Sequence, residues 1–143
     1  MRNSDAESQL RMILAAESEW SVLNAPKRNG ETGTDVLAVK DEILYFIEVI
    51  GYKSSGPARS KDLFEGFWRT ISRLEEAKTI GEAPKHHTIK LVLALPAEFK
   101  RGMEQRHLQY STAWSRIAHV FPELELWYIS DSTLDRRPWD RPI

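Results

Sequence analysis

Two carboxylates, Asp35 and Glu48, occupy positions that a β-hairpin would bring together. Glu48 interrupts an otherwise apolar run at residues 43–50, and Asp35 begins the preceding strand-like run, DVLAV. If the chain turns at Asp41 and Glu42, counting outward from the turn places Asp35 opposite Glu48 on one face of the hairpin. The spacing therefore predicts a pair of acidic side chains at the open end of this hairpin.

Facing carboxylates need compensation. Directly opposed side chains have Cβ atoms about 5 Å apart, and like charges at that distance destabilise a sheet, more so when buried. A raised pKa, a basic side chain or a bound cation would relieve the repulsion. Two hard oxygen ligands suit Mg²⁺ or Mn²⁺. In the alternative, structural interpretation, Asp35 ends the ETGTD turn and Glu48 pairs with a nearby arginine or lysine.

The hairpin that holds the pair is apolar on both faces. Counting outward from the turn puts Leu37, Val39, Leu44 and Phe46 on the face of the carboxylates. The opposite face carries Val36, Ala38, Tyr45, Ile47 and Val49. Strands that are apolar on both faces are typical of a sheet covered on both sides.

Hydrophobic periodicity places the other elements around this hairpin. Helices are predicted at about 5–17, where Ser4 and Glu7 have the spacing of a capping box, at 60–78 with Ser60 as the N-cap, and at 98–119. The second helix should bury Leu63, Phe64, Phe67, Trp68, Ile71 and Leu74, and the third Met103, Tyr110, Trp114 and Ile117. Further strands are predicted at TIKLVLALP and LELWYIS.

This order of elements predicts an α/β (α+β) three-layer sandwich with a mixed central sheet. The 143 residues fit a single domain. We expect that domain to span residues 1–131. The last segment, 132–143, contains two prolines and many charged residues, and it is interpreted as a polar tail.

The residues also resemble a known family, the PD-(D/E)XK nuclease superfamily, which has the restriction-endonuclease-like fold. The resemblance lies in Thr34-Asp35, in Glu48-Val49-Ile50 and in the αβββαβ order of elements. The stretch EVIGYKSSGPARSKDLFEGFWRTISRL, with LVLALP and FPELELW, is similar to small uncharacterised prokaryotic members. The resemblance covers about residues 5–130.

The resemblance implies a metal-dependent nuclease. Asp35, Glu48 and the Val49 carbonyl would hold Mg²⁺ (or Mn²⁺), which polarises a phosphodiester and acidifies its bound water. The sequence departs from the family pattern at two positions. Thr34 replaces a proline, and Ile50 replaces the lysine that orients the attacking water and offsets developing charge.

A displaced lysine would have to take that role. Lys53 follows the strand in a Gly- and Ser-rich loop, and Lys61 lies near the start of the next helix. Either is a candidate catalytic residue, and the alternative for each is a solvated cation. The resemblance also implies an acidic residue from the first helix. Glu7 matches that position, the capping box is its alternative, and Glu17 is a rival.

Basic side chains flank the proposed site. Lys27 and Arg28 precede the first carboxylate, while Arg59 and Arg69 follow the second, so these four are the candidate nucleic-acid contacts. The formal net charge of -1 means that an anionic partner must be met by such local patches. An ordinary charged surface is the alternative, because acidic residues lie among them.

Composition excludes several other classes. The chain has no cysteine, which removes disulfides, thiolate zinc sites and cysteine nucleophiles. No apolar run reaches the roughly 20 residues of a membrane helix, and the polar N-terminus does not look like a signal peptide. We therefore expect a cytoplasmic protein without a membrane partner.

The expected function is that of a divalent-metal-dependent endonuclease, a phosphodiester hydrolase that acts on DNA. A homodimer is an assembly that the sequence leaves open. The alternative is a catalytically inactive module of the same fold that binds nucleic acid or a protein partner. Ile50 is the residue that favours this alternative.

Overall fold

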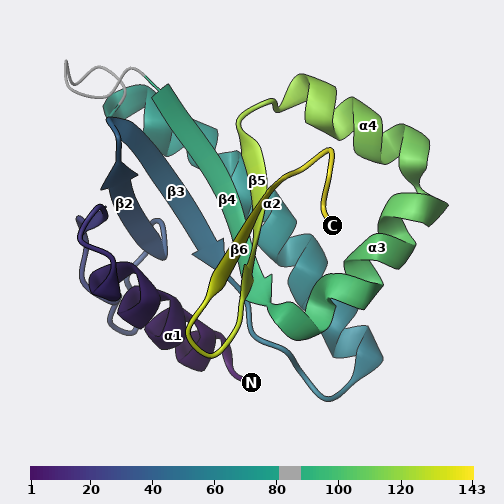
Figure 1. Ribbon diagram of the computed structural model, residues 1–143, viewed down its shortest axis with the longest axis horizontal. Coiled ribbons are helices and arrows are strands. Elements are labelled where there is room, and N and C mark those ends of the chain that lie inside the picture. The colour runs from purple at the N-terminus through teal and green to yellow at the C-terminus, as the bar shows by residue number, and fades with distance from the viewer. Residues whose placement is uncertain (81–87) are drawn as a thin grey trace.

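Six strands form one mixed sheet in residues 1–80 and 88–143, the part of the chain that the computed structural model describes (Figure 1). The sheet order follows the chain order, β1 to β6. The elements are α1 (Asn3–Ala16), β1 (Ser21–Val22), β2 (Val36–Lys40), β3 (Ile43–Val49), α2 (Gly56–Ile80), β4 (Thr88–Pro96), a 3₁₀ turn (Ala97–Phe99), α3 (Lys100–Gln109), α4 (Ser111–Val120), β5 (Leu124–Ile129) and β6 (Leu134–Pro138). The predicted mixed α/β class with a mixed central sheet is confirmed.

The β2–β3 hairpin has the register that the sequence predicts. Val36 pairs with Ile47 and Lys40 with Ile43, so the turn falls at residues 41–42. Both turn residues have positive φ, 53° and 65°. This is the backbone of a type I′ turn, whose twist matches that of the two strands it connects.

The centre of the sheet is parallel and its edges are antiparallel. Strands β3, β4 and β5 run parallel to one another, and α2 and the α3–α4 segment provide the two crossovers. The β1–β2, β2–β3 and β5–β6 pairs are antiparallel. Parallel strands are usually buried on both faces, and the run of buried residues in β3 and β4 agrees with that rule.

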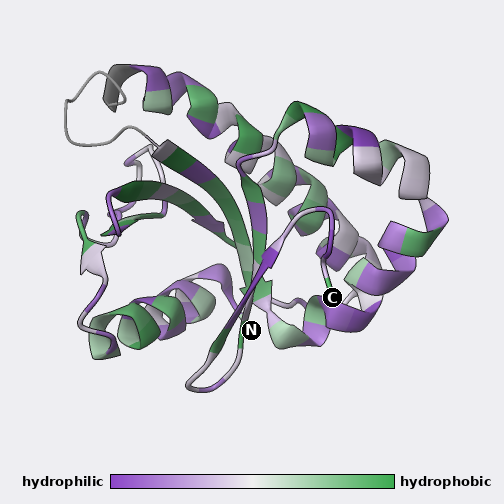
Figure 2. Ribbon diagram, turned by 45° about the horizontal axis from the view of Figure 1, so that its top comes forward, coloured by the Kyte–Doolittle hydropathy of each residue, from purple (hydrophilic) through white to green (hydrophobic). Residues whose placement is uncertain are grey.

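Helices cover both faces of the sheet, as predicted (Figure 1). The α1 face has its own apolar cluster, which includes Leu10, Ile47 and Trp127. The opposite face packs against α2, α3 and α4 through a second cluster that includes Phe46 and Leu93. Figure 2 shows that hydrophobic residues concentrate in the strands and on the helix sides that face them. No helix in the described residues is long and apolar enough to cross a bilayer.

Helix α2 lies close against the sheet at Gly66. A Cβ built on Gly66 would come within 2.8 Å of Ile50 Cγ2 and 3.1 Å of Leu93 Cδ1. Ile50 is fully buried there. A long charged side chain at position 50 therefore has no room, which gives a packing reason for isoleucine where the resemblance implies lysine.

The helix boundaries and buried faces differ from the predictions in several places. Helix α2 begins at Gly56, so Ser60 lies inside the helix and is not its N-cap. Phe64 and Trp68, predicted to be buried, are 72% and 67% exposed. They were misassigned because they lie next to the true buried stripe of α2, and an apolar residue beside such a stripe fits the same periodicity.

Two further helix predictions were wrong in detail. Helix α1 begins at Asn3, so Ser4 lies inside it and forms no capping box with Glu7. The residue before the helix, Arg2, donates to Asp5 Oδ2 through its backbone N–H and its Nε. The predicted helix 98–119 is a 3₁₀ turn followed by two helices, which break at Tyr110. Tyr110 is 55% exposed and therefore does not belong to the buried stripe.

The segment expected as a polar tail, 132–143, is part of the fold. It supplies the edge strand β6 and the buried Trp139. The Trp139 ring stacks on Trp114 of α4 with centroids 4.1 Å apart, and each indole N–H donates to the other residue's carbonyl. The charged residues of β6 conceal this role, because an edge strand keeps one side in solvent.

The tight α2 contact generates a stability prediction. Gly66→Ala should lower the free energy of unfolding by about 1 to 2 kcal/mol, because overpacking outweighs the gain in helix propensity. Gly56→Ala is the matched control. Its Cβ would meet nothing closer than the Arg59 Nη2 atom at 3.7 Å, so we expect a change within about 0.5 kcal/mol. Urea denaturation of both variants measures the difference, and equal effects would contradict the packing assigned to α2.

Candidate functional site

Asp35 and Glu48 lie side by side, as the hairpin register predicts. Asp35 immediately precedes β2 and Glu48 lies near the end of β3. Their carboxyl groups are within hydrogen-bonding reach of each other. The Val49 backbone N–H donates to Asp35 Oδ2 at 2.9 Å, which fixes the Asp35 side chain against β3. Glu48 is almost completely buried, with 2% of its side chain exposed.

Each carboxylate has a cationic partner. Lys27 Nζ lies 2.8 Å from Asp35 Oδ1 and also donates to the Gly33 carbonyl at 2.8 Å. Arg73 of α2 donates through Nε to Glu48 Oε1. Basic side chains therefore supply the compensation that the paired acids require.

A third acidic residue connects this group to the rest of α2. Glu76 Oε2 lies 3.7 Å from Arg73 Nη1 and accepts a hydrogen bond from Thr34 Oγ1 at 2.6 Å. Thr34 is itself buried. The contacts form a chain from the start of β2 through α2 to β3, and this chain positions both carboxylates.

The backbone around Asp35 is held by side chains from α1 and the following segment. Arg11 Nη2 donates to the Asp35 carbonyl at 2.8 Å, and Asn24 Nδ2 donates to the same oxygen at 3.2 Å. Asn24 Oδ1 accepts from Leu37 N at 2.8 Å. Glu7 pairs with Arg11 at 2.9 Å. Glu7 thus reaches the site through Arg11 and does not meet the carboxylate pair directly.

The pKa values of the two acids are shifted in opposite directions. Burial raises the pKa of Glu48 to about 8, and the nearby Asp35 charge adds to the rise, while Arg73 acts against it. Burial also acts to raise the pKa of Asp35. Hydrogen bonds from Glu48, Lys27 and the Val49 N–H outweigh that effect, so the pKa of Asp35 lies below its usual value. Glu48 is then the proton donor and Asp35 the acceptor.

The two lysines predicted to replace the missing one lie elsewhere. Lys61 pairs with Glu65 at 3.9 Å, and it lies twelve residues before Arg73 on α2, about 18 Å along the helix axis. Lys53 Nζ lies 4.0 Å from Asp62 Oδ2, one residue further along the same helix. Neither lysine is at the carboxylates, because the chain enters α2 at the end opposite Arg73.

The four candidate nucleic-acid contacts do not form one patch. Lys27 and Arg28 line a hollow of about 500 Å³ beside the pair, together with other residues of the same loop such as Glu31 and with Glu76 of α2. Arg69 is one helical turn from Arg73. Arg59 lies at the other end of α2, where it donates to the carbonyls of Lys53 and Ser54 and stacks over the Tyr52 ring.

Two carboxylates and a neighbouring backbone carbonyl are oxygen ligands that fit a hard divalent cation. Among the described residues, however, no group of three or more metal-ligating side chains assembles. The oxygen atoms Asp35 Oδ1 and Glu48 Oε1 are occupied by Lys27 and Arg73. A cation at this site would have to share the two carboxylates with those side chains.

Sequence reasoning missed the roles of Arg73 and Lys27 at the pair. A signal for Arg73 exists, because it lies on the stripe of α2 that also carries the buried residues Gly66, Thr70 and Ala77. A cation on an inward-facing stripe indicates a buried anion. Lys27 has no comparable signal, since an irregular loop delivers it to the site.

The raised pKa of Glu48 predicts a pH dependence. The Glu48 carboxyl binds its proton more tightly in the folded chain, so its contribution stabilises the protein below about pH 4.5 and is lost as pH rises through about 8. Between pH 5.5 and 8.5 the wild type should lose at least about 1 kcal/mol more stability than Glu48→Gln, which keeps the shape and a donor. Urea denaturation across pH tests this, and parallel profiles for the two proteins would disprove it.

Comparison of the chain with protein-family models, curated proteins and solved structures finds no match.

Proposed function

We propose that this protein is a divalent-metal-dependent nuclease that hydrolyses phosphodiester bonds of DNA at Asp35 and Glu48, on a restriction-endonuclease-like fold. The observation that carries the proposal is the position of Lys27. It brings an ammonium group to within 2.8 Å of Asp35 although the strand position expected for lysine is occupied by Ile50. Two acids and a lysine thus meet at one end of the hairpin.

The order of the elements supports the fold assignment. Helix α1 precedes three strands, α2 follows the hairpin, and β4 pairs parallel to β3. This is the αβββαβ order implied by the resemblance. The six-stranded sheet extends that order with β5 and the antiparallel edge strand β6.

The residues at the site have distinct roles in this proposal. Asp35 and Glu48, with the Val49 carbonyl, would hold Mg²⁺ or Mn²⁺, and the bound metal supplies Lewis acidity and a water of lowered pKa. Lys27 stabilises negative charge that develops on the phosphate, because its ammonium is already positioned beside the carboxylate. Glu7 acts indirectly, by holding Arg11 against the Asp35 backbone.

The hollow beside the pair would hold a nucleic-acid backbone through its two basic residues. Lys27 and the exposed Arg28 line it from the segment between β1 and β2, and Glu31 and Glu76 line it as well. The two basic side chains would contact phosphates, which is the sequence-independent part of nucleic-acid binding. Arg69 extends the same charge along α2, whereas Arg59 is too remote to contribute at this end.

Activity measurements on matched lysine variants test the proposal. With Mn²⁺ or Mg²⁺ and a mixture of linear and branched DNA substrates, the wild type should release cleaved products. Glu48→Ala should abolish cleavage. Lys27→Ala should reduce it by about a hundredfold or more, because it removes a charge that stabilises the transition state.

Lys61→Ala is the control. It removes the same charge from a residue that pairs with Glu65, far along α2, and cleavage should stay within about twofold of wild type because that charge does not reach the site. Cleavage that survives Glu48→Ala, or that falls equally in both lysine variants, would refute the assignment. Circular dichroism of each variant checks that the fold is retained.

A second candidate function is a non-catalytic nucleic-acid-binding module. The contact between Arg73 and Glu48 favours it, because that arginine already occupies the Glu48 oxygen that a metal would need. Ile50 points the same way, since it fills the lysine position with a packing residue.

Metal binding separates the two functions. For the module, isothermal titration with Mn²⁺ should give no saturable heat, while DNA binding should weaken with salt and fall further in Lys27→Ala and Arg28→Ala. For the nuclease, Mn²⁺ should bind the wild type and fail to bind Asp35→Asn. Metal binding that is unchanged in Asp35→Asn would contradict both functions, because the nuclease needs the Asp35 carboxylate as a ligand and the module binds no metal.

A further inference from the structure

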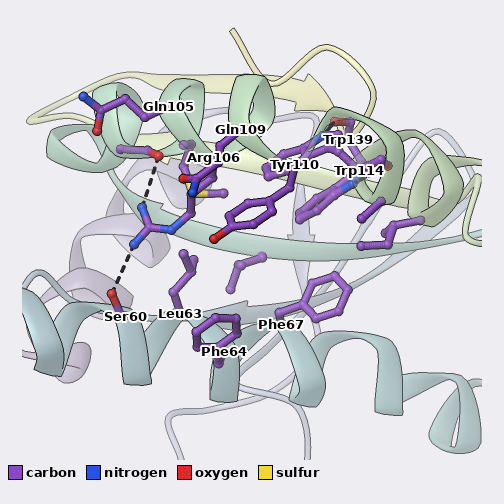
Figure 3. Close-up of a pocket in the computed structure, with 15 residues that line it drawn as sticks. Ser60, Leu63, Phe64, Phe67, Gln105, Arg106, Gln109, Tyr110, Trp114 and Trp139 are labelled. Atoms are coloured by element: carbon purple, nitrogen blue, oxygen red, sulfur yellow. Dashed lines mark hydrogen bonds between the residues drawn. The ribbon is translucent and has the colours of Figure 1, made fainter.

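A groove of about 790 Å³ runs between α2 and the α3–α4 layer, away from the carboxylate pair (Figure 3). Leu63, Phe64 and Phe67 of α2 form one wall, and Tyr110 and Trp114 contribute to the other. Figure 3 shows Tyr110 reaching into the space between the two layers. The size and the apolar lining are those of small-molecule sites in proteins, which usually enclose about 300 to 1,000 Å³.

The polar side chains of the groove gather at one end. Ser60, Gln105 and Arg106 lie there, Gln109 lies one helical turn beyond Gln105 on α3, and the rest of the lining is mostly apolar (Figure 3). Arg106 is the single charged residue among the described residues that line the groove. The groove is therefore amphipathic along its length, with a cation at one end and an aromatic, aliphatic body.

Arg106 has bonds to neutral groups and no carboxylate partner. Its Nη1 donates to the Gly102 carbonyl at 3.1 Å and its Nη2 to Ser60 Oγ at 3.2 Å (Figure 3). It forms no ion pair with the acidic residues of the described chain. A guanidinium carries five N–H donors in a fork that matches a carboxylate, so donors remain for an anionic group.

A second hollow joins the groove at this end and increases its positive charge. Arg59 and Arg101 line it together with Arg106, while Glu98 is the one acidic residue there. The excess of positive charge favours an anion at the junction. It disfavours a purely apolar ligand and a cationic one.

We propose that the groove is a binding site for a small amphiphile with one anionic head, such as a carboxylate, and one apolar body. The head pairs with Arg106 and the body covers Phe64 and Tyr110, which are otherwise exposed. Charge complementarity identifies this occupant, because the groove offers one unpaired cation and a long apolar surface. The proposal is independent of the nuclease function, since Leu63 lies ten residues, about 15 Å, from Arg73 along α2.

Three ligands with the same chain length and different heads test the proposal. Decanoate, decan-1-ol and decyltrimethylammonium are titrated below their micelle concentrations, and tryptophan fluorescence is followed because Trp114 lines the groove. Decanoate should bind saturably at one site per chain and at least about tenfold more tightly than the other two.

Matched arginine variants test the role of Arg106. Arg106→Ala should weaken the binding of decanoate at least about tenfold. It should change the affinity for decan-1-ol little, and that result also shows that the groove is intact. Arg116→Ala removes the same charge from an exposed position on α4 that lines neither hollow, and it should change decanoate binding by less than about threefold. Ala113→Trp, which fills the groove, should abolish binding of both ligands.

Several outcomes would overturn the proposal. These are equal affinity for the three heads, decanoate binding that is unchanged in Arg106→Ala, and absence of saturable binding. A dimer in sedimentation that Ala113→Trp dissociates and decanoate does not disturb would assign the groove to a second copy of the chain instead. A thermal melt of each variant shows that its fold is retained.

Discussion

The buried pair of acids at Asp35 and Glu48 is the constraint on which this end of the molecule depends. A β-hairpin with this register cannot separate the two carboxyl groups, and the helix layer above removes water from Glu48. The repulsion is relieved by Lys27, by Arg73 and by the raised pKa of Glu48, which favours its protonated form. The contacts of Thr34 and Asn24, and the position of Arg73 on α2, serve to hold these partners in place.

Much of the architecture could be predicted because it follows from local patterns. The alternating faces of residues 36–49 and the polar turn fix the hairpin register, and the register in turn fixes the neighbours of Glu48. Apolar runs define β4 and β5 in the same way. Each of these elements follows from a hydrophobic pattern that is visible in one short window of sequence.

The predictions that were wrong concern contacts between segments that are distant in the sequence. The buried role of Trp139 requires Trp114, and the exposure of Trp68 depends on how α2 is rotated against the sheet. The partner of Glu48 could have been predicted, because Arg73 lies on the inward-facing stripe of its helix. The partner of Asp35 could not, because Lys27 lies in an irregular loop with no period.

The fit of Ile50 beneath Gly66 has a consequence for how the site carries its positive charge. A lysine on the strand would have its backbone held by the sheet. Lys27 instead belongs to a loop that is held by a few hydrogen bonds of Asn24 and Gly33. Loops open at a lower free energy than core strands. The charge balance of the acids is therefore set by local order in the loop, and it can change while the sheet beneath stays folded.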